Sequence, residues 1–230
     1  MFWQTIDGVT TPSGDEITLR QRGDLFEIRY NGIELMSNVN HHSEEQLALR
    51  LMRRLEYRAQ KLLIGGLGMG FTLRAVLDHA PSDAEITVCE LIPEVAAWNV
   101  THLAHLAGAP LSDPRVRVVL GDIRQHLARS HGIYDLILMD TDNGPDIIIR
   151  QDNEAIYGAA GLDTLFRAMR PDGMAAFWSA TASPSFEATL TEFGWRWERD
   201  EVALIPGRVD AMHYIYTCPN DAALHLRRAA

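Results

Sequence analysis

The strongest chemical signal in the sequence is a glycine-rich run, LLIGGLGMG, at residues 62–70. An apolar strand pattern leads directly into the glycines, and a helical pattern begins after them. Gly66, Gly68 and Gly70 have the spacing G-x-G-x-G, which permits a sharp turn and a close approach of the backbone to a ligand. A dinucleotide fingerprint would place its third glycine at position 71, which is Phe71. The tighter spacing favours the Rossmann-like domains that bind S-adenosylmethionine.

Acidic residues stand at the carboxyl ends of the next three predicted strands. They are Glu90, Asp122 and Asp140. A carboxylate at the first position can accept both hydroxyls of a ribose. An acid at the second can accept the exocyclic amine of adenine, with the backbone N–H of Ile123 on a ring nitrogen. Because the carboxyl ends of parallel strands meet at one edge of a sheet, we expect these groups to surround one ligand.

The elements that must position these residues alternate between strand and helix from Lys61 onward. The predicted strands are 61–64, 85–90, 116–120, 134–140, 173–179, 195–204 and 212–217. The predicted helices are 70–79, 93–107, 123–130, 155–169 and 185–193. Five strand–helix units followed by a terminal strand pair predict an open α/β sheet.

The first 42 residues follow a different pattern. Polar and apolar residues alternate in three short segments separated by turn dipeptides, which predicts a β-hairpin and a third strand. The segments are 16–21, 25–30 and 33–36. Such small strands should pack on the main domain or on a second subunit. We therefore divide the chain into a small N-terminal β region, 1–42, and a Rossmann-like catalytic domain, 43–230, with Ser43 as the N-cap of its first helix.

Composition excludes several classes of protein. The 230 residues carry 31 acidic and 21 basic side chains, a net charge of −10, which argues against nucleic-acid binding. Cys89 and Cys218 form neither a CxxC motif nor a metal-ligand cluster, so we expect no disulfide scaffold, no metal and a reducing cytoplasm. No apolar run reaches 18 residues and the N-terminus lacks a secretion-signal pattern, so no membrane association is expected.

As a set, these motifs resemble the spermidine synthase (polyamine aminopropyltransferase) family. The resemblance covers about residues 60–180 and, more weakly, the N-terminal strands, which correspond to the small β-domain of that family. It implies a class I methyltransferase-like fold, with a seven-stranded, mostly parallel sheet covered by helices on both faces, and a homodimer. The segments that carry it are LIGGLGMG at 63–70, LRAVLDH at 73–79, Cys89-Glu90, DPRVRVVLGD at 113–122 and YDLILMD at 134–140.

The resemblance also implies roles for individual residues. The donor substrate would be an S-adenosyl sulfonium nucleoside and the acceptor a small, cationic amine. In the family, the acid after the fourth strand binds and deprotonates the attacking amine, because an amine must lose a proton to attack the carbon next to sulfur. Asp140 and Asp142 would carry out this step. The nucleoside would be bound by Gly66, Gly68, Gly70, Glu90, Asp122, Ile123 and Asp140.

Two departures from the family pattern affect the reaction. The segment DTDNGP at 140–145 replaces D-S-S-D-P, so Asn143, or Asp142 in a shorter loop, stands at the second acid. Leu67, Gly68 and Met69 replace Gly, Asp and Gly. The leading hypothesis is aminopropyl transfer from decarboxylated S-adenosylmethionine to a small polyamine. The loss of an acid at Gly68 removes a repulsion of the full donor, which favours methyl transfer from S-adenosylmethionine as the alternative.

Other interpretations stay open on the sequence alone. A binding protein that senses the nucleoside without catalysis is consistent with the altered acid segment. A nicotinamide dehydrogenase is disfavoured by Phe71. His41-His42, before the first helix, is either a gate over the pocket or a solvated helix cap, and Trp178 is either a wall of the acceptor pocket or part of the core.

Overall fold

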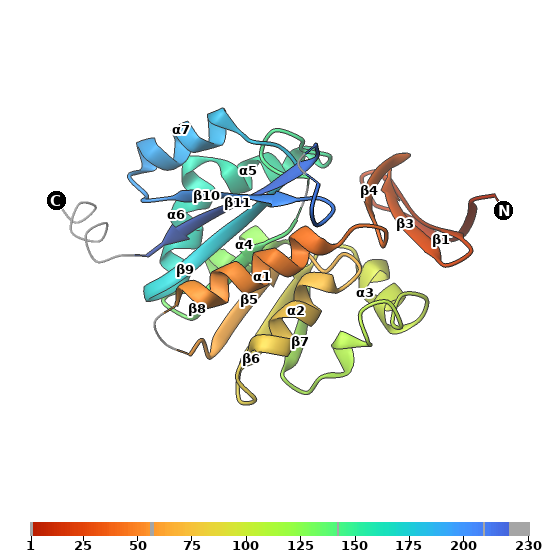
Figure 1. The fold of residues 1–230 in the computed structure, drawn as a ribbon, viewed down its shortest axis with the longest axis horizontal. Coiled ribbons are helices and arrows are strands. Elements are labelled where there is room, and N and C mark those ends of the chain that lie inside the picture. Colours follow the sequence, from red (N-terminus) through yellow and green to blue (C-terminus); the bar gives the residue numbers. More distant parts are fainter. Residues whose placement is uncertain (1, 56–57, 142, 209, 221–230) are drawn as a thin grey trace.

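The structure is a computed structural model that describes residues 2–55, 58–141, 143–208 and 210–220. Its main body is a seven-stranded sheet with the order β10-β11-β9-β8-β5-β6-β7 (Figure 1). The strands β5, β6, β7, β8 and β9 are parallel, and β11 and β10 are antiparallel to their neighbours. The strand bounds are β5 Lys61–Gly65, β6 Glu85–Glu90, β7 Val116–Leu120, β8 Tyr134–Met139, β9 Met169–Ser179, β10 Glu198–Ala203 and β11 Met212–Pro219.

Helices cover both faces of this sheet. Helices α1, α2 and α3 lie on the face that is toward the viewer in Figure 1, and α4, α6 and α7 lie on the other. The predicted α/β class with a seven-stranded, mostly parallel sheet is confirmed. The helix bounds are α1 His42–Arg54, α2 Phe71–His79, α3 Pro93–Val100, α4 Ile123–Ala128, α5 Glu154–Tyr157, α6 Ala159–Ala168 and α7 Pro184–Phe193, with short 3-10 turns η1 Pro110–Ser112 and η2 Gln151–Asn153.

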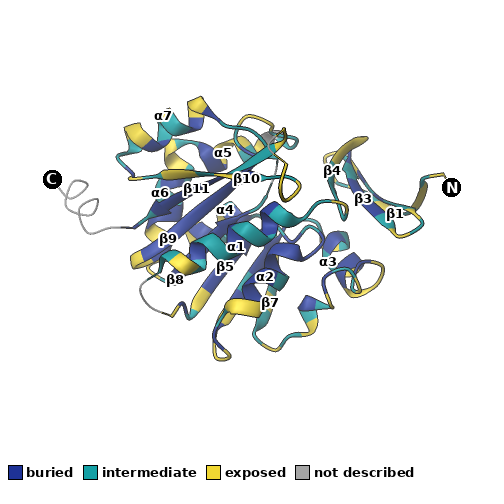
Figure 2. Ribbon diagram, viewed as in Figure 1, coloured by how far each residue is buried: buried dark blue, intermediate teal, exposed yellow. Residues whose placement is uncertain are grey.

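The central strands are buried on both faces (Figure 2). Successive side chains point to opposite faces of a strand, so a continuous apolar run supplies both layers of the core. In β5, Leu62 and Ile64 pack in the cluster that includes α1 and α2, and Leu63 packs in the cluster on the opposite face. The buried run therefore forms β5, which ends at Gly65, and the glycine-rich turn begins there.

A separate antiparallel sheet with the order β1-β2-β3-β4 forms the N-terminal region. Its apolar side chains, such as Ile28, belong to the same buried cluster as Trp98 of α3, and Asp7 accepts a hydrogen bond of 2.8 Å from the Trp98 indole. The division into two domains at residue 42 stays a prediction. The strands are β1 Gln4–Thr10, β2 Glu16–Arg22, β3 Leu25–Tyr30 and β4 Ile33–Ser37.

The structure corrects some local predictions. The prediction of three N-terminal strands missed β1, whose side chains are mostly exposed and therefore carry a weak apolar pattern. The N-cap of α1 is His41 rather than Ser43, because the Ser43 hydroxyl hydrogen-bonds the neighbouring Glu44 side chain instead of the helix backbone. The predicted helix 155–169 is interrupted at Gly158, whose backbone is extended.

Candidate functional site

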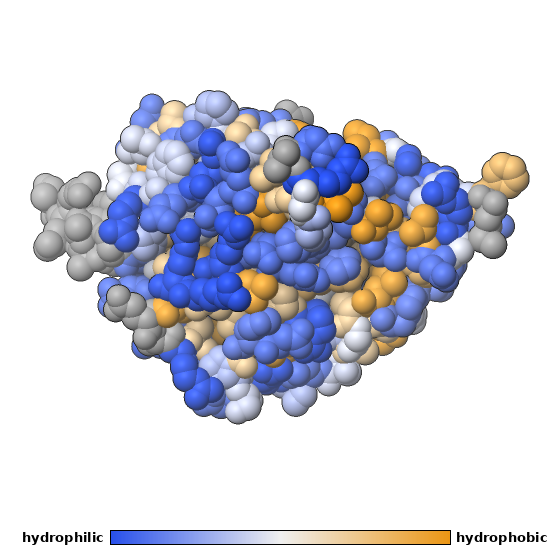
Figure 3. All heavy atoms as spheres, in the orientation of Figure 1, coloured by the Kyte–Doolittle hydropathy of each residue, from blue (hydrophilic) through white to orange (hydrophobic). Residues whose placement is uncertain are grey.

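A pocket of about 1120 Å³, including the open water at its mouth, lies at the carboxyl ends of the parallel strands. The N-terminal sheet forms its apolar side, and Figure 3 shows hydrophobic residues gathered on this part of the surface. Strands far apart in sequence therefore enclose one cavity. Its walls include Ile28, Leu35, Met36, Glu44, Gly66, Gly68, Glu90, Asp122, Ile123, Asp140, Thr141 and Trp178.

The glycine-rich turn lines this pocket through Gly66 and Gly68. Gly66 has a φ of +89°, and a Cβ there would lie 2.1 Å from the carbonyl oxygen of Asp140. Glycine is required at this position because β5 and β8 end side by side. Gly70, with a φ of +84°, is the N-cap of α2, so it shapes the end of the turn rather than the pocket wall.

Glu90 is 7% exposed and lies at the end of β6. Its two carboxylate oxygens accept backbone hydrogen bonds from Leu67, at 2.9 Å, and from Ile92, at 2.8 Å. Burial raises the pKa of this carboxyl, and the backbone hydrogen bonds oppose the rise. The carboxylate is therefore held in one orientation toward the cavity, next to the glycine-rich turn.

Asp122 lines the pocket and is also the N-cap of α4. Its side chain accepts hydrogen bonds from the backbone N–H of Arg124, at 2.8 Å, and from the Arg124 guanidinium, at 2.6 Å. Burial alone would raise the pKa of Asp122, but the contacts with Arg124 outweigh it and the pKa is lowered. The carboxylate is therefore ionised at neutral pH, and Ile123 follows it in the pocket wall.

Asp140 stands directly after β8, where the chain leaves the sheet. The hydroxyl of Thr72, in the first turn of α2, donates a hydrogen bond of 2.6 Å to its Oδ2 atom. Burial raises the pKa of Asp140 above the usual range of an aspartate, and the Thr72 hydrogen bond opposes this. The sequence motifs did not indicate Thr72, although it lies two residues after the last glycine of the turn.

The second acid beside Asp140 is one that the sequence motifs missed. Glu44, in the first turn of α1, is 8% exposed and lines the same pocket. Burial, and then repulsion by the Asp140 charge, raise the pKa of Glu44. Its Oε2 atom accepts a hydrogen bond of 2.6 Å from Ser43, and the Ser43 hydroxyl lies 2.8 Å from Nδ1 of His213 in β11. In sequence, Glu44 looks like an ordinary acid in the first turn of a helix.

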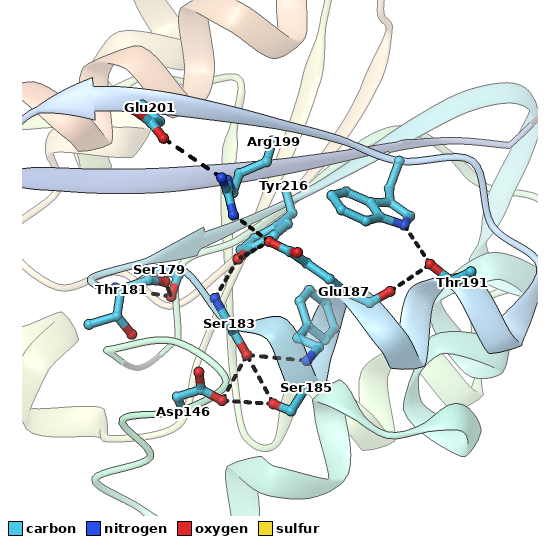
Figure 4. Close-up of polar contacts among 12 residues, drawn as sticks. Asp146, Ser179, Thr181, Ser183, Ser185, Glu187, Thr191, Arg199, Glu201 and Tyr216 are labelled. Atoms are coloured by element: carbon cyan, nitrogen blue, oxygen red, sulfur yellow. Dashed lines mark hydrogen bonds and ion pairs between the residues drawn. The ribbon is translucent and has the colours of Figure 1, made fainter.

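The loop after Asp140 is anchored at Asp146. Its Oδ1 atom accepts hydrogen bonds from the hydroxyls of Ser183, at 2.7 Å, and Ser185, at 2.8 Å, at the start of α7 (Figure 4). Tyr216 of β11 accepts a hydrogen bond from the backbone N–H of Ser183 and so extends this network into the sheet. Asp142, predicted to be catalytic, lies outside the described residues.

Two buried donor groups at the pocket have no hydrogen-bond partner in the part of the chain that the structure describes. They are the Trp178 indole N–H and the Thr141 hydroxyl. Trp178 is 8% exposed, so it is both a core residue and a wall of the pocket. The His41 ring stacks on Phe71 with centroids 4.0 Å apart, and the gating role predicted as one alternative for the histidine pair stays a prediction.

Neither a metal centre nor a membrane-spanning helix is found in the described ranges. Among residues 2–55, 58–141, 143–208 and 210–220, no group of three or more His, Cys, Asp or Glu side chains is arranged to hold a metal ion. Within the same ranges, no helix has both the length and the apolar character needed to cross a membrane.

Comparison with known proteins identifies the family. The model of the spermine/spermidine synthase domain matches residues 43–193. The chain belongs to this family. The spermine/spermidine synthase match includes the glycine-rich turn, Glu90, Asp122 and Asp140, so the resemblance drawn from these motifs is confirmed.

Named relatives of this chain agree with the assignment. A polyamine aminopropyltransferase of Bacillus mycoides is 32% identical over 131 residues, which cover 57% of this chain and 44% of that protein. Polyamine aminopropyltransferase 2 of Pseudomonas aeruginosa is 33% identical over 119 residues, 50% of this chain and 32% of the relative. The matched region therefore spans less than half the length of these curated relatives.

Solved structures show the same fold. A spermidine synthase in complex with the transition-state analogue AdoDATO superimposes with a TM-score of 0.72 at 18% identity, covering 94% of this chain and 72% of that chain. Spermidine synthase from Thermotoga maritima also gives a TM-score of 0.72, at 17% identity and the same coverage. These similarities confirm the class I methyltransferase-like architecture predicted for the family.

The raised pKa values of two carboxyls in this domain predict a pH-dependent stability. Folded Glu44 and Asp140 bind protons more tightly than they do in the unfolded chain, so the free energy of unfolding falls as the pH rises above their ordinary pKa values. Glu44→Gln removes one titrating group and its repulsion of Asp140. We expect the loss of unfolding free energy between about pH 5 and about pH 8 to be smaller in E44Q by about 1 kcal/mol or more.

Urea unfolding at both pH values measures this difference. Glu45→Gln is the matched control, because Glu45 is only partly buried on the same helical turn and pairs with His41 at 2.8 Å. The Glu45 charge is only the last of the causes that raise the pKa of Glu44, so E45Q should change the pH profile much less than E44Q. Parallel profiles for the wild-type protein and E44Q would contradict the expectation.

Proposed function

We propose that this protein transfers an aminopropyl group from decarboxylated S-adenosylmethionine to a small aliphatic amine. The observation that carries this proposal is the pair formed by the buried Glu44 and the half-buried Asp140, two carboxyls that repel each other in one pocket. Neither forms an ion pair with an Arg or Lys side chain within the described residues. Family membership and the names of the curated relatives support the same reaction.

The donor substrate would occupy the side of the pocket formed by the glycine-rich turn. Gly66 and Gly68 would approach the sulfonium nucleoside, with Gly70 shaping the turn, and Glu90 would accept the ribose hydroxyls. Asp122 and Ile123 would meet the adenine. The backbone hydrogen bonds from Leu67 and Ile92 orient the Glu90 carboxylate for this contact before the ligand arrives.

The reaction is an in-line displacement at the carbon next to sulfur. The lone pair of the acceptor nitrogen forms a C–N bond, the C–S bond breaks, and its electron pair stays on sulfur to give methylthioadenosine. The nitrogen loses a proton, which Asp140 accepts, and the protein holds the two substrates in line. Asp142 remains the second proposed catalytic acid.

Methyl transfer is the second candidate function, and one observation favours it. The flexible side chain of Met36, from β4, lies against Gly68, with its sulfur 2.5 Å from where a Cβ would stand. An apolar group therefore occupies the part of the turn where the family has an acid. The carboxylate of full S-adenosylmethionine would meet less repulsion there.

Thermal unfolding with five ligands, NAD among them, tests both candidates. We expect decarboxylated S-adenosylmethionine and methylthioadenosine to raise Tm most, since a ligand at 100 times its Kd contributes about 2.7 kcal/mol. A larger rise with S-adenosylmethionine and S-adenosylhomocysteine would instead support methyl transfer. A response to NAD alone would contradict both and support the dehydrogenase alternative.

We also propose a homodimer and a cytoplasmic location. Ile33 and Val39, at and after β4, are 57% and 55% exposed, and pairing of the N-terminal sheet with a second copy would cover such residues. The acceptor is a small molecule under this proposal. The net charge of −10 suits a cationic substrate better than a nucleic acid.

A further inference from the structure

We propose that Asp146 is a positioning residue for the reaction, because it holds the segment 143–146 in place as part of the pocket wall that follows Asp140. This inference rests on the proposed function and deepens it. Asp146 is not one of the residues that line the pocket in the described ranges, so it would act only through the segment that it holds. That segment begins at Asn143, in the stretch where this chain departs from the acid pattern of the family.

The residue before this part of the wall, Asp140, is held without any help from Asp146. Its backbone N–H donates a hydrogen bond of 2.9 Å to the carbonyl oxygen of Gly65, and its side chain accepts the hydrogen bond from Thr72. Thr141 and Asn143 then continue the wall of the pocket. The position of the wall beyond Asp140 therefore depends on attachments further along the chain.

The first of these attachments is to the end of β9. The backbone N–H of Ala180 donates a hydrogen bond of 3.1 Å to the carbonyl oxygen of Asn143. Gly144 is buried, has a φ of +107°, and lies so close to Ser179 that a Cβ would stand 2.2 Å from the Ser179 hydroxyl oxygen. The backbone of the segment thus runs directly against β9, with one hydrogen bond to keep it there.

Asp146 provides the second attachment, which we call the Asp146 clamp and which consists of Asp146, Ser183 and Ser185. One carboxylate oxygen, Oδ1, accepts a hydrogen bond from each serine hydroxyl, at 2.7 and 2.8 Å (Figure 4). Ser183 is fully buried and is the N-cap of α7, where its hydroxyl accepts the backbone N–H of Phe186. Asp146 itself is exposed, so it ties a surface loop to a buried helix end.

The Asp146 clamp is attached to the main sheet through Tyr216 of β11. The backbone N–H of Ser183 donates a hydrogen bond of 2.7 Å to the Tyr216 hydroxyl, which in turn donates to Glu187 of α7 at 3.3 Å. Glu187 also forms an ion pair of 2.6 Å with Arg199 of β10 (Figure 4). The partners of Asp146 are therefore fixed by a helix and two strands.

Removal of the Asp146 side chain should loosen the segment without unfolding the domain. Water can replace the hydrogen bonds of an exposed carboxylate in part, so the effect on global stability is small. The segment would keep only its contacts with β9 and would move relative to Asp140. Small displacements of groups around a reacting centre lower the rate strongly, because the substrates are then no longer held in line.

Turnover of Asp146→Ala and Asp146→Asn by the full chain tests this role, measured as methylthioadenosine formed from decarboxylated S-adenosylmethionine and 1,4-diaminobutane. We expect D146A to lower kcat by about 10- to 100-fold, with the affinity for methylthioadenosine close to that of the wild-type protein. D146N keeps the accepting oxygen and should restore most of kcat. Asp83→Ala, the matched control, removes an exposed acid between α2 and β6 and should leave kcat unchanged.

Hydrogen exchange followed by mass spectrometry gives a second measurement that does not depend on turnover. Peptides that cover residues 143–148 should exchange faster in D146A than in the wild-type protein. Peptides from β8 and from the rest of the main sheet should keep their exchange rates. The wild-type pattern is expected in D146N and in D83A, because both retain the hydrogen bonds of the Asp146 clamp.

The outcomes distinguish the Asp146 clamp from the proposed function. A wild-type kcat in D146A, or unchanged exchange at 143–148, would overturn the positioning role and leave the proposed function standing. A loss of kcat in D146N as large as in D146A would assign the effect to the charge and would also overturn it. So would faster exchange throughout D146A, which would show a general loss of stability. If the wild-type protein forms no methylthioadenosine with any amine, the proposed function falls and the positioning role falls with it.

Discussion

Replacing Asp140 with asparagine is expected to lower kcat for aminopropyl transfer by about 10²- to 10⁴-fold, the usual contribution of a general base. The amide carries no charge to attract the ammonium and cannot accept its proton. The hydrogen bond from Thr72, 2.6 Å long, can still be accepted by the asparagine oxygen. The loss should therefore appear in turnover, with methylthioadenosine affinity nearly unchanged.

Formation of methylthioadenosine in a single turnover measures the effect. Asp83→Asn is the control, because Asp83 is an exposed acid between α2 and β6 and its substitution removes the same charge away from the pocket. Turnover in D140N equal to that of the control would exclude Asp140 as the base. Absence of turnover with any amine in the wild-type protein, despite nucleoside binding, would support the non-catalytic alternative.

The second large effect is expected from Gly66→Ala. A Cβ at Gly66 would lie 2.1 Å from the backbone oxygen of Asp140, so the ends of β5 and β8 must move apart. The positive φ of +89° adds strain for any residue with a Cβ. Together these effects should lower the free energy of unfolding by about 2–5 kcal/mol. Nucleoside binding should weaken as well, because the turn lines the pocket.

Gly14→Ala separates the two contributions. Gly14 has nearly the same φ, +90°, but no atom lies within 4 Å of the position that a Cβ would take there. Substitution of Gly14 should lower the free energy of unfolding only by the backbone strain, about 1–2 kcal/mol. Urea unfolding of both variants gives the contribution of the contact with Asp140 by difference. Equal destabilisation in G66A and G14A would show that β5 and β8 can separate without cost.

Much of the fold followed from local patterns in the sequence. Apolar runs such as Leu62–Ile64 predicted buried strands, and the glycine spacing predicted a tight turn because residues with a Cβ are strained in that backbone conformation. The acids at positions 90, 122 and 140 were found because each lies at the end of a predicted strand or within two residues after it. The strand β1 was missed because most of its side chains are exposed, so its sequence lacks the alternation of apolar and polar residues that marks a strand.

The hydrogen bonds at the site join segments that are distant in the sequence. Thr72 and Asp140 are 68 positions apart, and Ser43 and His213 are 170 apart, so no spacing rule connects them. Glu44 became a candidate only when α1 brought it beside Asp140, where burial and repulsion distinguish it from Glu45.

The sequence by itself determined the chain order of the seven strands of the main sheet, the glycine-rich turn and the acids at the strand ends, since each depends on near neighbours in the chain. The tertiary structure alone decided that the N-terminal sheet closes the pocket, that Met36 lies against Gly68 and that two carboxyls face one cavity. Packing decides these features, because burial and charge repulsion arise only when separate elements meet.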